Sequence, residues 1–119
     1  MRKLRHAALT LCASTLLLTA SVGAQTYPTK PIRMLVGFTP SGPTDLTARI
    51  AAQYLSEALG QQVLVDNRPG AGGTLAGGLL ARAEPDGYTI ALGANGEIAI
   101  APALRKKLPY HPLKDFAPI

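Results

Sequence analysis

The stretch that decides the fold is residues 32–45, which read Ile32-Arg33-Met34-Leu35-Val36-Gly37-Phe38-Thr39-Pro40-Ser41-Gly42-Pro43-Thr44-Asp45. Its first half is an apolar run too short for a buried helix and bounded by turn residues, which is typical of a strand. Its second half is a polar loop in which Pro43 suits the first turn of a helix. The stretch therefore predicts a strand, a loop and the start of a helix.

An amphipathic helix of about four turns is predicted directly after this loop. Gly60 stands where a left-handed cap would end it. The apolar residues that recur at spacings of three and four are Leu46, Ile50, Ala51, Tyr54, Leu55 and Ala58.

The same alternation of strand, loop and helix continues downstream. Residues 63–66 and 88–92 are predicted strands, and a shorter helix is predicted between them from Leu75, Leu79, Leu80 and Ala83. Strands that alternate with helices at this spacing form a parallel sheet with right-handed crossovers. The predicted fold class is therefore α/β.

The region after Leu92 predicts a short helix over residues 98–104, then a proline-rich run, and residues 116–119 resemble the approach to another strand. Three strands would leave an unprotected sheet edge. We therefore expect residues 25–119 to be an incomplete N-terminal α/β domain of a longer chain.

The first 24 residues are predicted to be an export signal. A basic segment with Arg2, Lys3 and Arg5 precedes an apolar segment over residues 7–20, and small residues lead to a cleavage site near Ala24. Thr and Ser interrupt the apolar segment, which makes it too short for a membrane anchor. Cys12 would be removed with the signal, which excludes a disulfide scaffold. The export signal itself predicts a periplasmic location.

Charge also points away from nucleic acid. The chain carries a formal net charge of +5, but the signal holds three of the basic residues and leaves nine against seven acidic residues, a net charge of +2. The remaining cluster, Arg105-Lys106-Lys107, is typical of a solvated helix end.

Three polar loops follow the three predicted strands, at residues 39–45, 67–74 and 93–97. Because parallel strands end on one edge of a sheet, these loops should converge there, where such sheets bind ligands. The first two also begin helices, whose free N–H groups bind carboxylate or phosphate. The structural alternative is that Ser41, Thr44 and Asp45 are capping residues and that Arg68 is a brace beside Asp66.

Catalytic and cofactor motifs are missing from the mature sequence. The glycine-rich loop has Leu75 where a dinucleotide fingerprint requires Gly or Ala, and no P-loop lysine follows. His111 has no second His or Cys for a metal site, and Ser41 lies in no nucleophile elbow. We therefore predict a binding protein, not an enzyme, with no metal and no cofactor.

An ordered set of motifs, covering nearly everything after Gln25, resembles one receptor family. The motifs are Tyr27-Pro28-x-Lys30-Pro31-Ile32-Arg33, Pro40-Ser41-Gly42-Pro43-Thr44-Asp45, Leu55-Ser56-Glu57-x-Leu59-Gly60-Gln61, Asn67-Arg68-Pro69-Gly70-Ala71-Gly72-Gly73, Pro85-Asp86-Gly87-Tyr88-Thr89, and Leu108-Pro109-Tyr110 through Lys114-Asp115-Phe116. The family is that of the Bug-type extracytoplasmic solute-binding proteins of tripartite tricarboxylate transporters.

The resemblance implies a two-domain Venus-flytrap fold in a chain about three times as long. It implies a cleft that captures a mono-, di- or tricarboxylate or an amino acid through backbone amides, hydroxyls and water, and delivery to the transporter's membrane subunits. The residues carried over to the cleft are Ser41, Gly42, Thr44, Asp45, Ala94 and Asn95, with Gly72 and Gly73 in the neighbouring loop. Pro43 departs from the family's usual glycine and removes one backbone donor.

Two other functions stay open from the residues alone. A small α/β enzyme could use the same sheet edge for a phosphorylated or carboxylated substrate, and a cell-envelope interaction protein would bind no small ligand. Titration with a panel of carboxylates separates these three functions, because a receptor gives one-to-one binding heat without turnover.

Overall fold

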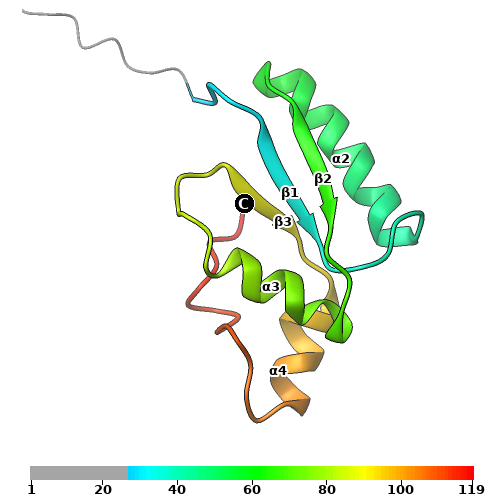
Figure 1. The fold of residues 1–119 in the computed structure, drawn as a ribbon, viewed down its shortest axis with the longest axis vertical. Helices are drawn as coiled ribbons and strands as arrows, with labels where there is room; N and C mark the ends of the chain where they lie inside the picture. The colour runs from blue at the N-terminus through cyan, green and yellow to red at the C-terminus, as the bar shows by residue number, and fades with distance from the viewer. Residues whose placement is uncertain (1–26) are drawn as a thin grey trace, which may run out of the picture.

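The computed structural model describes residues 27–119 and contains a three-stranded parallel sheet with helices packed against it (Figure 1). The strands are β1 (Ile32–Val36), β2 (Val63–Asn67) and β3 (Thr89–Leu92). They lie in the order β2-β1-β3, with Ile32 opposite Val63 and Arg33 opposite Thr89. The predicted α/β class and parallel sheet are confirmed.

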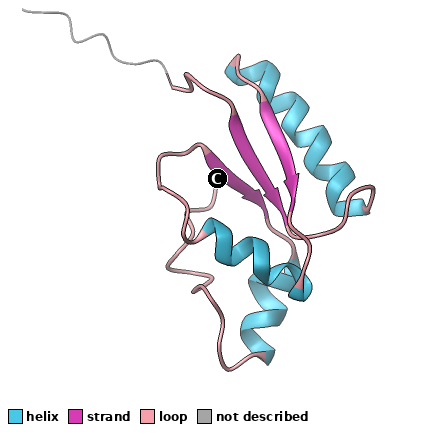
Figure 2. Cartoon of the chain, in the orientation of Figure 1, coloured by secondary structure: helices cyan, strands magenta, loops and turns pink. Residues whose placement is uncertain are grey.

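Helices follow the strands, as the sequence predicts (Figure 2). Pro43 opens α2 (Pro43–Leu59), and Gly60 ends it in the left-handed conformation with a φ of 65°. A single 3₁₀ turn, η2 (Ala71–Gly73), leads into α3 (Thr74–Leu80). After β3, a wide helical turn, η3 (Gly96–Ile100), continues into α4 (Ala101–Leu104), so the predicted helix over residues 98–104 is confirmed and starts earlier.

The core lies between β1 and α2. Ile32, Met34 and Val36 point to one face of β1, where they pack with Ala48 and Ala52 of α2. Leu35 is also buried but points to the other face, because side chains alternate along a strand. Right-handed crossovers to opposite sides of β1 place α2 and α3 on opposite faces of the sheet.

The predicted inner face of α2 is partly wrong. Ala48 and Ala52 form the buried stripe, while Leu46, Ile50 and Tyr54 are more than half exposed. Alanines let the helix lie close to the sheet, so the stripe with the smaller side chains faces inward. Ser56 then reaches the backbone of Ala52 and Val63, through hydrogen bonds of 2.6 and 2.9 Å.

Residues 105–119 form no strand in the structure, and the predicted approach to a strand at residues 116–119 is an irregular segment. Tyr110 anchors it: the ring is buried beside Gly77, and the hydroxyl donates a 2.6 Å hydrogen bond to the Glu97 carbonyl. Within residues 27–119 no helix is long and apolar enough to span a membrane. The predicted export signal lies outside the described residues.

Candidate functional site

The topology places a candidate site at the carboxyl ends of β1 and β3. The connection after β1 runs through α2 to β2 on one side, and the connection after β2 returns past β1 to β3 on the other. The direction of the crossovers therefore reverses between β1 and β3, and parallel sheets open a ligand crevice at such a point.

A hollow of about 300 Å³ lies at this point. It lies between the start of α2 and the end of β3. Its lining residues are Pro43, Thr44, Thr47, Leu92, Gly93 and Ala94. Thr44 and Ala94 were predicted site residues, while Thr47 was missed; its position one turn beyond Pro43 was the available signal. None of the six carries a charge.

The start of α2 lines this hollow with Pro43 and Thr44. Gly42 is the N-cap residue, with a φ of −81° and a ψ of 171°, and no side chain caps the helix there. The Leu46 amide already donates to the Gly42 carbonyl at 3.0 Å. The amides before it have no carbonyl one turn earlier, and they carry the partial positive charge of a helix N-terminus.

Asp45 belongs to the same loop, but its side chain is engaged in hydrogen bonds within the protein. Its side chain is buried and accepts hydrogen bonds from the Ser41 amide at 2.8 Å, Arg49 at 2.9 Å and Asn67 at 3.0 Å. The bond from Arg49, then those from Ser41 and Asn67, lower the pKa of Asp45 to about 2. These bonds make it a brace that holds Ser41 at a positive φ of 66°.

The predicted second loop lies beside the third. Gly72 is exposed with a φ of 68°, whereas Gly73 is buried with a φ of 90° and donates its amide to the Gly70 carbonyl at 3.0 Å. Ala94 is half-buried and Asn95 is exposed. Site roles for the eight predicted residues remain predictions, although the structure brings them to one edge.

Glu97 is, with Thr47, a residue of this edge that the sequence prediction did not select. It is 6% exposed, and its Oε1 accepts a 3.0 Å hydrogen bond from the Ala94 amide. Burial raises the pKa of Glu97, and the bond from Ala94 opposes that shift. A lone acid at the end of the predicted third loop, directly before the apolar residues of the predicted helix, was the signal that could have identified it.

Arg68 is paired with Asp66 and is thereby held away from a role in binding an anion. Its Nε lies 2.9 Å from Asp66 Oδ1, and Arg33 Nε lies 2.6 Å from Oδ2 of the same carboxylate. Desolvation acts to raise the pKa of Asp66, but the bonds from Arg33 and Arg68 together leave it lowered. The alternative prediction of a brace therefore matches the geometry.

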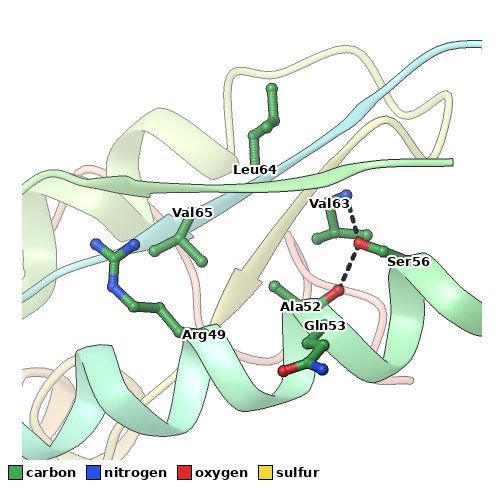
Figure 3. Close-up of a pocket in the computed structure, with 7 residues that line it drawn as sticks. All are labelled: Arg49, Ala52, Gln53, Ser56, Val63, Leu64 and Val65. Atoms are coloured by element: carbon green, nitrogen blue, oxygen red, sulfur yellow. Dashed lines mark hydrogen bonds between the residues drawn. The ribbon is translucent and has the colours of Figure 1, made fainter.

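A second hollow, of about 400 Å³, lies between α2 and the edge strand β2 (Figure 3). Ser56 and Val63 meet on its floor, Leu64 points away from α2, and Arg49 stands at one end. Arg49 is the only cation among its lining residues, and its Nε is bound to Asp45. The charge of Arg49 is thus paired with that of Asp45.

The described part of the chain contains no candidate metal site. Within residues 27–119, no group of three His, Cys, Asp or Glu side chains is placed to hold an ion.

Comparison with known proteins decides the family. Residues 47–119 match the family described as "Tripartite tricarboxylate transporter family receptor". The chain belongs to this receptor family. A UPF0065 protein of Bordetella bronchiseptica is 45% identical over 92% of the chain, which covers 34% of that relative. The chain thus spans about a third of the length of the curated relatives that it matches.

Solved structures agree with this membership in the receptor family. The periplasmic binding protein BugD is similar with a TM-score of 0.75 and 45% identity, over 78% of this chain and 31% of BugD. MatC from Rhodopseudomonas palustris, solved with bound malate, is similar with a TM-score of 0.74 and 42% identity, over 77% of this chain and 31% of MatC. The resemblance to Bug-type receptors is confirmed, and these homologues are receptors rather than enzymes.

Proposed function

We propose that the chain forms one wall of the binding cleft of a periplasmic receptor, which captures a small carboxylate and delivers it to the membrane subunits of a tripartite tricarboxylate-type transporter. The observation that carries this proposal is the uncapped start of α2 beside an uncharged hollow at the switch point of the sheet. Membership in the receptor family and the malate bound in MatC support it.

The chemistry of the edge favours an anion held without a salt bridge. The hollow itself is lined by no cation, while helix N-terminal amides and the Thr44 hydroxyl can donate hydrogen bonds to carboxylate oxygens. Arg68, the only cation in the three strand-end loops, is paired with Asp66. A mono-, di- or tricarboxylate or an amino-acid carboxylate fits these donors.

Isothermal titration of the full-length protein against acetate, malate, citrate and glutamate tests the proposal. Each acid is compared with its uncharged amide, which keeps the shape and removes the negative charge. At least one acid should bind one-to-one at micromolar concentration or tighter, and its amide should not. Absence of binding to every acid, or equal binding of acid and amide, would remove the basis of the proposal.

A further inference from the structure

Glu97 places a buried carboxyl group beside the proposed anion site, which carboxylate binding by itself does not require. Resting on that function, we propose that Glu97 is a positioning residue of the binding edge, and that its carboxyl group is uncharged when an anion is bound there. Binding of the anion is then coupled to a proton on Glu97.

The first observation is an incomplete set of hydrogen bonds. Oε1 of Glu97 accepts the 3.0 Å bond from the Ala94 amide. Oε2 is buried and has no hydrogen-bond partner within residues 27–119. A buried carboxylate with one unsatisfied oxygen is costly, whereas the protonated acid carries no net charge to desolvate.

The second observation is that the Glu97 carboxyl group packs against loops from all three strands. A Cβ atom added at Gly73 would overlap Oε2, and one added at Gly37 would lie 3.1 Å from it. Ala94, which follows β3, holds the other oxygen. Gly37 follows β1 and Gly73 lies in the loop after β2, so a change in the Glu97 carboxyl group acts on all three loops.

The third observation concerns charge. Glu97 forms no ion pair within the described residues. Tyr110 approaches from the C-terminal segment, but its hydroxyl donates to the Glu97 backbone carbonyl. Arg105, beyond α4, donates from Nη2 to the Ala71 carbonyl at 3.2 Å. Gly37, Gly73 and Gly93 contribute no titratable side chain, and burial raises the pKa of Glu97.

These observations connect Glu97 to the ligand through Ala94. Ala94 lines the hollow and shares a hydrogen bond with the Glu97 carboxyl group. An anion in the hollow would therefore lie close to a second negative charge if Glu97 were ionised, in surroundings that screen the repulsion poorly. A proton on Glu97 removes that repulsion and leaves Oε1 as the acceptor for Ala94.

The test is the affinity of the full-length protein for its tightest-binding carboxylate between pH 4.5 and 8.5, in buffers free of carboxylates. Glu97→Gln is measured in parallel, because glutamine keeps the Oε1 acceptor and the shape but cannot ionise. The ligand's own titration affects both proteins equally. Relative to Glu97→Gln, wild-type affinity should therefore fall by up to about tenfold per pH unit above the pKa of Glu97.

A second measurement on the wild type covers the case in which Glu97→Gln does not fold. Titration in two buffers of different ionisation enthalpy should reveal uptake of a proton on binding at pH values above the pKa of Glu97 in the free protein. Parallel pH profiles for the two proteins, or no proton uptake across the range, would overturn the role of Glu97 while leaving carboxylate binding intact. If no carboxylate binds the wild type at any pH, the proposed function itself fails.

Discussion

Asn67 Nδ2 lies 3.0 Å from Asp45 Oδ1, and this hydrogen bond joins the end of β2 to the first turn of α2. The same Nδ2 lies 3.1 Å from the Phe38 carbonyl, so it also holds the loop that leaves β1. One amide group therefore ties two of the three strand-end loops together.

Asn67→Ala should destabilise the full-length protein by about 1–2 kcal/mol, because two part-buried hydrogen bonds are lost and their acceptors are left unpaired. Urea unfolding followed by circular dichroism measures the change. Gln53→Ala is the matched control, since its amide bonds only to exposed Glu57, at 3.3 Å, and should cost close to nothing. Equal losses in the two variants would show that the Asn67 bonds do not hold the loops.

Alanine substitutions at the two glycines of the second loop should differ in how much stability they cost. Gly73→Ala combines a φ of 90° with overlap on Glu97 and should cost about 2–4 kcal/mol. Gly72→Ala has a φ of 68° but open space around the new atom, so only the backbone strain of about 1 kcal/mol applies. Thermal unfolding of both variants measures the difference, and a larger loss at Gly72 would contradict the packing of Glu97 against Gly73.

Acid stability should depend on Asp45. Its pKa is about 2 in the folded protein against an ordinary value of 3.8, so the folded state binds its proton less readily than the unfolded state. The stability that this group contributes is present above about pH 4 and is lost as the pH falls through its folded pKa. Asp45→Asn should therefore show a shallower loss of unfolding free energy between pH 4 and 2. Identical slopes for wild type and variant would be the contrary result.

The sequence predicted the elements well because each has a local cause. Short apolar runs gave β1, β2 and β3, while Pro43 and Gly60 marked both ends of α2. The inward face of α2 was less predictable, since the apolar repeat contains two neighbouring stripes. Close packing selected Ala48 and Ala52 over the larger side chains.

The position of the candidate site in the fold could be predicted from the sequence, whereas the contacts between its residues could not. Loops that follow parallel strands must meet, so Thr44 and Ala94 could be placed at one edge in advance. The bonds of Asp45 with Asn67, 22 residues away in the sequence, depend on how the second strand ends beside the first. The burial of Glu97 likewise depends on the glycines of loops that are distant in sequence.

Removal of the N-terminal segment remains a prediction from the sequence. The basic, apolar and small-residue regions over residues 1–24 predict cleavage near Ala24. Mass spectrometry of the exported protein should find a new terminus near Gln25. A soluble periplasmic product that retains Met1 would contradict it.

If amides and hydroxyls hold the anion, titration of three full-length variants with the same carboxylate should give a definite order of affinities. Arg68→Ala should weaken binding by less than tenfold, about 1.4 kcal/mol, because Arg68 is paired with Asp66. Gly42→Val should cost far more by blocking the approach to the α2 amides; the φ of −81° suits any residue, and an added Cβ would lie 3.4 Å from the Thr39 carbonyl, an ordinary contact. Thr44→Val should fall between them, since it deletes one hydroxyl hydrogen bond worth about 1 kcal/mol. Loss of binding in Arg68→Ala with unchanged binding in Gly42→Val would mean that a salt bridge holds the ligand.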